Sequence, residues 1–163
     1  MKNGLVISDA GPIFSLATID RLDILLEIFD EVYIPRAVWL ELTLDKETIY
    51  YQIIVDFLKD KVREIQSFND LSFIMDFGES ESVVLYRELQ ADFLLIDDRK
   101  ARQIAESLGA RCVGTIGVLL KAKEKGIIQK LKPLFEQLLS DKRYYSLKLL
   151  NEVLRLQNED EIG

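Results

Sequence analysis

The sequence predicts an α/β fold in which a mainly parallel sheet carries helices on both faces. Short apolar runs rich in β-branched residues alternate along the chain with longer segments of helical periodicity. Such alternation favours βαβ units, whose ligand sites lie outside the carboxyl ends of the strands. With 163 residues, 48% of them hydrophobic, the chain can bury one core. We therefore expect a single domain over residues 1–157 and a frayed acidic tail over residues 158–163.

The expected elements follow the chain in order. Five short β-rich runs, each bounded by turn residues or charges, are predicted as strands: residues 4–8, 32–35, 62–66, 93–96 and 111–115. The pattern is weakest for residues 62–66. Apolar residues three and four apart predict helices over residues 22–29, 37–43, 48–58, 81–89, 100–108, 116–125, 131–139 and 146–156.

The composition excludes several kinds of site. Histidine is absent and Cys112 is the only cysteine. An internal disulfide, a zinc site built from Cys and His, a Ser-His-Asp triad and a Cys-His dyad are therefore excluded. Any chemistry must use carboxylates, hydroxyls, Lys or Arg.

The first apolar run is too short to cross a membrane and is interrupted by Asp9, Gly11 and Pro12. This pattern is not that of a signal peptide or an anchor. We therefore expect a cytoplasmic protein without a membrane partner.

The charges are unevenly distributed along the chain. Residues 1–98 contain 8 Lys or Arg against 20 Asp or Glu, whereas residues 99–148 contain 12 against 4. Solvated helix faces would explain a moderate basic stretch. A basic flank beside an acidic pocket also suits a site that cuts phosphodiesters, because cations hold phosphates while anions hold metals.

Acidic residues follow two predicted strands and occupy two predicted helices. Asp9 follows the first strand, and Asp97 and Asp98 follow the strand at 93–96. Glu79 and Glu81 open the helix after Gly78, and Glu41 lies within the helix after residue 35. The carboxyl ends of parallel strands share one edge of the sheet, so we expect these acids to converge there.

Each acid also has a purely structural explanation. Asp9 and Asp98 could cap the helices that follow them. Glu79 and Glu81 could complement a helix dipole, and Glu41 could face solvent. These explanations do not predict the whole set on one side of the sheet. Four or five converging carboxylates repel one another unless a cation lies among them, and an all-oxygen ligand set favours Mg²⁺ or Mn²⁺.

Five stretches, taken in order, resemble those of a known family: ISDAGPIFSLA, IPRAVWLEL, FGESESVVLYREL, LLIDDRKARQIAESLG and VGTIGVLLKAKEKGII. The chain resembles the PIN-domain proteins, and most of all the prokaryotic subfamily known as domain of unknown function 3368. The resemblance implies a three-layer α/β/α nuclease fold with an acidic Mg²⁺ or Mn²⁺ pocket. Such proteins often cut RNA and often act as the toxin of a toxin-antitoxin pair, so RNA, an antitoxin protein and a second copy in a homodimer are the expected partners.

When the family's acids are matched to this sequence by position, the resemblance implies catalytic roles for Asp9, Glu41, Glu79 and Asp98. It implies metal ligation by these four residues and by Asp97 and Glu81. Glu79 matches the third family acid best and Glu81 competes with it. Of Asp97 and Asp98, one is expected to hold metal or water while the other supports it. Three basic residues after the acidic pair are expected to bind nucleic acid: Arg99, Lys100 and Arg102.

Two departures from the family pattern bear on activity. Ala10 stands where many members have a hydroxyl residue, and the third acid is glutamate where many have aspartate. A module that binds RNA or protein without strong catalysis is therefore the main alternative. A response-regulator receiver is excluded because too little chain follows Asp98. The tyrosine pairs at 50–51 and 144–145 could stack on bases, but their apolar surroundings favour helix packing.

Overall fold

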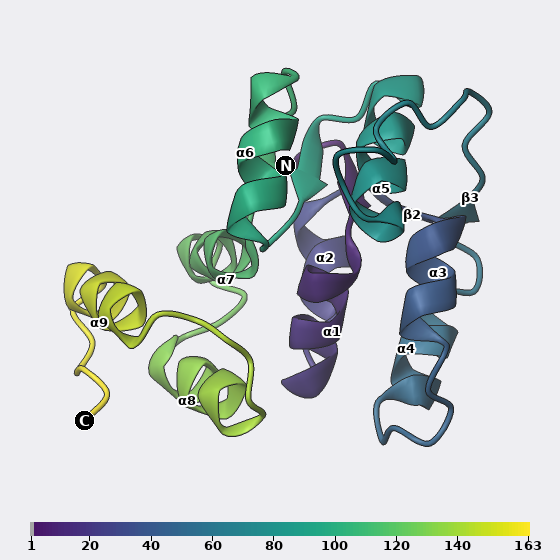
Figure 1. The fold of residues 1–163 in the computed structure, drawn as a ribbon. Coiled ribbons are helices and arrows are strands. Elements are labelled where there is room, and N and C mark those ends of the chain that lie inside the picture. The colour runs from purple at the N-terminus through teal and green to yellow at the C-terminus, as the bar shows by residue number, and fades with distance from the viewer. Residues whose placement is uncertain (1) are drawn as a thin grey trace.

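Five short apolar segments pair into one parallel sheet in the computed structural model, which describes residues 2–163 (Figure 1). The strands are β1 (Leu5–Ser8), β2 (Glu31–Pro35), β3 (Val62–Arg63), β4 (Phe93–Leu95) and β5 (Cys112–Val113). Every pairing is parallel, and the spatial order is β3-β2-β1-β4-β5. The predicted α/β fold with three layers is confirmed, and all five expected segments contain a strand.

The strand order creates a switch point beside the central strand. From β1 the chain builds outward through β2 to β3, then returns to place β4 on the other side of β1. β1 and β4 pair from Val6 opposite Phe93 to Ser8 opposite Leu95, so the two strands end side by side. Doubly wound sheets open a crevice at this position, because the chain leaves neighbouring strands in opposite directions.

Helices cover both faces of the sheet. They are α1 (Ala10–Thr18), α2 (Asp23–Ile28), α3 (Arg36–Leu42), α4 (Tyr51–Leu58), α5 (Phe77–Glu88), α6 (Arg99–Ser107), α7 (Thr115–Glu124), α8 (Lys132–Ser140) and α9 (Leu147–Leu156). Within residues 2–163 no helix combines the length and the apolar character that a membrane crossing requires. Figure 1 shows α8 and α9 beside each other at the end of the molecule that carries the C-terminus.

Successive residues of the strands pack into different cores. Ile7 and Leu94 belong to the core under α5 and α6, together with Val84 and Ala105. Val6 belongs to the larger core, which joins α1, α2 and the C-terminal helices. Side chains alternate across a strand, so this partition gives the three layers directly.

The acidic tail after α9 is held against the domain, although we expected it to be frayed. Both carboxylate oxygens of Glu159 accept a hydrogen bond from the amide of Leu131 at 2.9 Å, and Oε1 accepts another from Lys132 at 3.0 Å. Its Oε2 lies 2.6 Å from the ammonium group of Lys123, and the side chain is 7% exposed. Glu159 thereby satisfies free amides at the start of α8, which no side chain of α8 caps.

Replacing Glu159 with alanine should therefore destabilise the fold. Glu159→Ala leaves two buried amides and one ammonium group without their acceptor, and we expect the free energy of unfolding to fall by about 1–3 kcal/mol. Chemical denaturation monitored by circular dichroism measures this loss. Asp160→Ala, at an exposed neighbouring position, is the matched control. Equal stability of the two variants would contradict the role assigned to Glu159.

Candidate functional site

A cavity of about 370 Å³ lies beyond the carboxyl ends of β1 and β4. Its lining combines six carboxylates with one arginine and two tyrosines: Asp9, Gly11, Glu41, Asp76, Glu79, Asp97, Asp98, Arg143, Tyr144 and Tyr145. The acids come from the ends of two strands and from the beginnings or interiors of separate helices. The structure therefore brings together Asp9, Glu41, Glu79, Asp97 and Asp98, as the sequence predicts.

Asp9 occupies the N-cap position of α1, but its side chain makes no capping hydrogen bond. The residue is only 8% exposed. A methyl group on Gly78 would lie 3.4 Å from Oδ1 of Asp9 and 2.9 Å from Oε1 of Glu41. Asp9 and Glu41 thus approach the same stretch of backbone at the start of α5, where glycine leaves room for both.

Asp97 is fixed by three hydrogen bonds from two later segments. Its Oδ1 accepts from the Thr115 amide at 2.7 Å, and its Oδ2 accepts from the Thr115 hydroxyl at 2.6 Å. The Tyr145 hydroxyl also donates to Oδ2, at 2.8 Å. Burial and the charge of Asp97 raise the pKa of Tyr145 to about 12, so this hydroxyl remains a donor. Asp97 is therefore held rigidly at the edge of the cavity.

Two other acids of the cavity cap helices. Asp98 Oδ1 accepts from the Ala101 amide at 2.8 Å at the start of α6, and Asp76 Oδ1 accepts from the Glu79 amide at 2.9 Å at the start of α5. These bonds fix both backbones and use one oxygen of each carboxylate. The acidic pair at 97–98 is therefore explained by two local roles: Asp97 binds the start of α7, and Asp98 caps α6.

Of the two glutamates near the start of α5, only Glu79 lines the cavity. The Glu81 carboxylate accepts a hydrogen bond from the Ala37 amide at 3.0 Å. Ala37 lies in the first turn of α3, the helix that carries Glu41. Glu81 therefore lies outside the acid cluster and fixes the helix that supplies one of its members.

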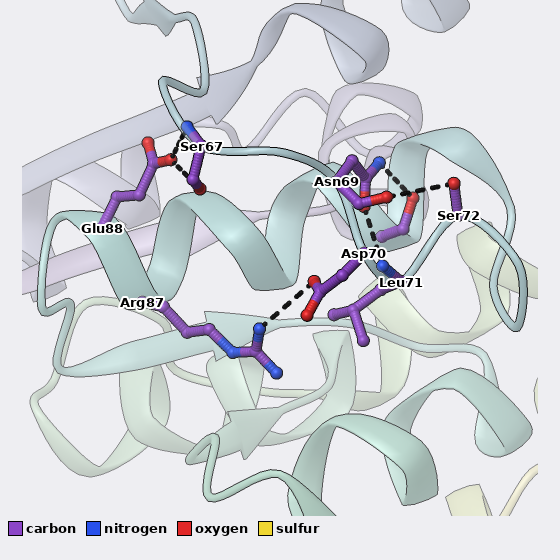
Figure 2. Close-up of polar contacts among 8 residues, drawn as sticks. Ser67, Asn69, Asp70, Leu71, Ser72, Arg87 and Glu88 are labelled. Carbon is purple, nitrogen blue, oxygen red and sulfur yellow. Dashed lines mark hydrogen bonds and ion pairs between the residues drawn. The ribbon is translucent and has the colours of Figure 1, made fainter.

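The loop that carries Asp76 is fastened to α5 (Figure 2). Glu88 accepts hydrogen bonds from the Ser67 amide at 2.7 Å and from the Ser67 hydroxyl at 2.5 Å. Arg87 lies 3.5 Å from Asp70. Figure 2 shows these contacts together with the turn that Asn69 stabilises. The loop thus reaches the start of α5 in a fixed conformation.

Burial and mutual repulsion disfavour the charged form of Asp9. Its pKa is raised to about 7, mainly by burial and further by the charges of Glu41, Asp76 and Asp97, while the hydrogen bond with the Ala10 amide lowers it in part. The pKa of Glu41 is also raised, by burial and then by Asp76.

Glu79 is affected in the same way. Burial raises its pKa to about 8, and a hydrogen bond with Asp76 and the charges of Asp76, Asp9 and Asp98 act in the same direction. Without a cation, the cavity therefore retains protons at neutral pH that ordinary carboxylates would release.

The predicted basic residues of α6 occupy three different environments. Arg99 is exposed and does not line the cavity. Lys100 borders an adjoining groove that shares Asp76, Glu79 and Asp98 with the cavity. Arg102 pairs with Glu106 at 2.9 Å and donates to the Cys112 carbonyl at 3.3 Å. Of these three residues, only Lys100 borders a groove that is lined by acids of the cavity.

The all-oxygen donor set suits Mg²⁺ or Mn²⁺. Within residues 2–163 no three Asp, Glu, His or Cys side chains are already arranged around a single point that a metal ion could occupy. Magnesium commonly binds proteins through only one or two carboxylates and keeps water in its other positions. Asp9 and Glu41, which approach the same glycine, fit that requirement.

Sequence reasoning missed four residues that shape the site: Asp76, Thr115, Arg143 and Tyr145. Asp76 had a readable signal, since an acid three residues before a glutamate at a helix start is a capping pattern. The other three lie far along the chain from the acids, and no local pattern connects them to Asp97 or to the cavity.

Comparison with known proteins agrees with the fold. A family model described as PIN domain, that of domain of unknown function 3368, matches residues 5–159. The chain belongs to the PIN-domain family. This family indicates a nuclease-like fold and a nucleic-acid substrate. No curated protein matches the chain.

The raised pKa values predict how the stability of this PIN domain changes with pH in metal-free buffer. Folded Asp9 and Glu79, with pKa values of about 7 and about 8, bind protons up to those pH values, whereas the unfolded chain releases them near the ordinary pKa values of 3.8 and 4.5. The folded state therefore binds more protons across this interval, and stability falls as pH rises through it.

Thermal melting in EDTA should show this fall for the wild type and a flatter profile for Asp9→Asn and Glu79→Gln. Glu152→Gln, at an exposed position of α9, should melt like the wild type at every pH. A wild-type melting temperature that rises between pH 5 and pH 8, with the same slope in all variants, would be incompatible with a repulsive acid cluster.

A second prediction separates the role of Asp98 as the cap of α6 from its repulsion with Glu79. Asp98→Ala removes the cap of α6 and should lower the free energy of unfolding by about 1 kcal/mol. Asp98→Asn keeps an oxygen at the cap position and relieves repulsion with Glu79, so its stability in EDTA should equal or exceed that of the wild type. Urea denaturation compares the variants, and equal losses in both would show that the cap is not the source of the effect.

Proposed function

We propose that this PIN-domain protein is a ribonuclease that depends on Mg²⁺ or Mn²⁺ and hydrolyses phosphodiester bonds in the acidic cavity. One observation carries the proposal: Asp9, Glu41, Glu79 and Asp98 belong to separate elements but line a single cavity. Such a concentration of acids costs folding free energy, and a bound divalent cation would offset that cost.

Asp9 and Glu41 would hold the ion. Glu79 and Asp98 would supply further oxygens, either to the ion directly or to the waters bound to it. When bound, such an ion lowers the pKa of water and stabilises the negative charge that develops on phosphoryl oxygens. In the reaction a water oxygen bonds to phosphorus while the bond from phosphorus to the leaving ribose oxygen breaks. Asp97, held by Thr115 and Tyr145, would fix the position of the backbone next to it.

The groove beside the cavity is where we propose that the RNA backbone continues. Lys100 borders this groove and carries no ion pair with an acid of residues 2–163. Arg99 is exposed at the first position of α6. Both can contact phosphates on either side of the scissile bond, whereas Arg102 is already paired with Glu106.

We further propose that the nuclease acts as a toxin restrained by an antitoxin protein. Large apolar side chains are exposed on and beside the loop that precedes α5, next to the acids: Phe68, Phe73, Ile74 and Phe77. Exposed apolar side chains grouped in this way suit a protein partner. The same surface could instead join two copies of the chain, and sedimentation of the purified protein distinguishes a homodimer from a monomer that awaits its partner.

A binding module with little catalytic activity is the second candidate. Ala10 provides no hydroxyl beside Asp9, and Asp97 and Asp98 are both engaged by backbone amides. A protein of this kind would bind RNA or a protein partner through the same surface without cleaving RNA.

Metal binding and cleavage, measured together, separate the two candidates. Millimolar Mn²⁺ should raise the melting temperature of the wild type, because a ligand at 100 times its Kd stabilises the native state by about 2.7 kcal/mol. The rise should shrink in Asp9→Asn and Glu41→Gln, and cleavage of a fluorescent single-stranded RNA should fall about 100-fold or more in both.

Glu152→Gln is again the control, since it removes one exposed carboxylate that does not line the cavity. It should keep the response to Mn²⁺ and the cleavage rate of the wild type. A wild type that neither gains stability from Mn²⁺ nor cleaves RNA would reject the nuclease and favour the binding module.

A further inference from the structure

The cavity contains one positive side chain among its six carboxylates, and that side chain neutralises none of them. Arg143 is the only Lys or Arg in the lining. Its Nε donates to the Ser15 hydroxyl at 2.9 Å, and a terminal nitrogen donates to the Gly11 carbonyl at 3.4 Å. Its guanidinium carbon lies 4.9 Å from the centre of the Phe14 ring. No carboxylate of residues 2–163 forms an ion pair with it.

The neutral contacts of Arg143 hold it in place and leave its charge available. All three partners, Gly11, Phe14 and Ser15, belong to α1, which begins directly after Asp9. A guanidinium group has five donors, and the two bonds to α1 occupy only part of them. An arginine fixed in this way at an acidic site is suited to a phosphate, which it can bind through two parallel hydrogen bonds.

Tyr144 is exposed, and hydrogen bonds fix the side chains of the residues before and after it. On one side of it is Arg143, and on the other is Tyr145, whose hydroxyl lies 2.8 Å from the Ser15 hydroxyl and 2.8 Å from Asp97 Oδ2. Tyr144 itself is 97% exposed and borders the cavity. The backbone is thus fixed on both sides of an aromatic ring that is open to solvent. Such a ring offers a flat face on which an unpaired base can stack.

We infer that Arg143 and Tyr144 form the substrate-binding edge of the site, with Arg143 binding a backbone phosphate and Tyr144 stacking on an unpaired base. The inference rests on the proposed nuclease function and assigns to these two residues the selection of an unpaired strand. In a duplex the bases are stacked on one another, so Tyr144 would have no free face to contact. The same edge explains how a chain of net charge −7 can hold a polyanion beside six acids, because the one arginine of the lining is already oriented by its bonds to α1.

Fluorescence anisotropy with a labelled single-stranded RNA and with a hairpin duplex of the same composition tests the inference. Titrations in Ca²⁺, a hard cation that also binds oxygen ligands, keep the acids occupied, and a gel after each titration checks that the RNA is intact. We expect the wild type to prefer the single strand. Tyr144→Ala should weaken that binding roughly 5- to 150-fold and leave the duplex unaffected, whereas Tyr144→Phe should keep the wild-type affinity.

Arg143 is tested by the salt dependence of binding. Arg143→Ala should reduce the slope of log affinity against log salt by about 0.7, the value for one phosphate of a single strand. Arg143→Lys should restore the slope but only part of the affinity, since lysine binds phosphate as a point charge. Lys130→Ala, at an exposed position with no contact to the cavity, should change neither quantity. Melting curves of all variants establish that each is folded at the temperature of the titration.

The outcomes separate this inference from the proposed function. Binding of the single strand that depends on both residues, without cleavage in Mn²⁺, would reject the nuclease and keep the binding edge. Cleavage and binding that are both unchanged in Tyr144→Ala and Arg143→Ala would keep the nuclease and overturn the inference. Equal affinity of the wild type for single strand and duplex, or affinity for neither, would also overturn it.

Discussion

Repulsion among carboxylates at the edge of the sheet is the constraint on which the other features of this structure depend. Parallel strands β1 and β4 end side by side, so the residues that follow them meet at one point. Asp9 follows one strand, Asp97 and Asp98 follow the other, and neighbouring helices add Glu41, Asp76 and Glu79. Burial first, and then the charges of neighbouring carboxylates, raise the pKa values of Asp9 and Glu79, so the charged forms of both are disfavoured when no cation is present.

The domain tolerates the repulsion because three of these six acids also stabilise local structure. Asp76 and Asp98 cap the helices that begin next to them, and Asp97 joins the end of β4 to the start of α7 through Thr115. Glu81, which lies outside the cavity, fixes the helix of Glu41. Asp9 makes no such contribution, since its buried side chain caps no helix. Local structure therefore does not account for its position in the cavity, nor for those of Glu41 and Glu79.

The parts of this arrangement that follow from local sequence were predictable, and the parts that follow from long-range contact were not. Apolar runs ending in acids predicted the strands and the convergence of Asp9 with Asp98, because parallel strands share their carboxyl edge. Whether Glu79 or Glu81 enters the cavity depends on the rotation of α5 against α3, which periodicity alone does not define. Tyr145 was expected to serve in helix packing, yet its hydroxyl binds Asp97, 48 residues earlier in the chain.

The hydrogen bonds from Arg143 through Ser15 and Tyr145 to Asp97 also join parts of the cavity that are made at different times during protein synthesis. Every acid of the cavity precedes residue 143 in the chain, whereas the cation and both tyrosines are residues 143–145. A nascent chain that has not reached this segment contains all six acids and lacks the three residues that complete the lining. The binding edge that we infer is therefore complete only after residues 143–145 have been synthesised.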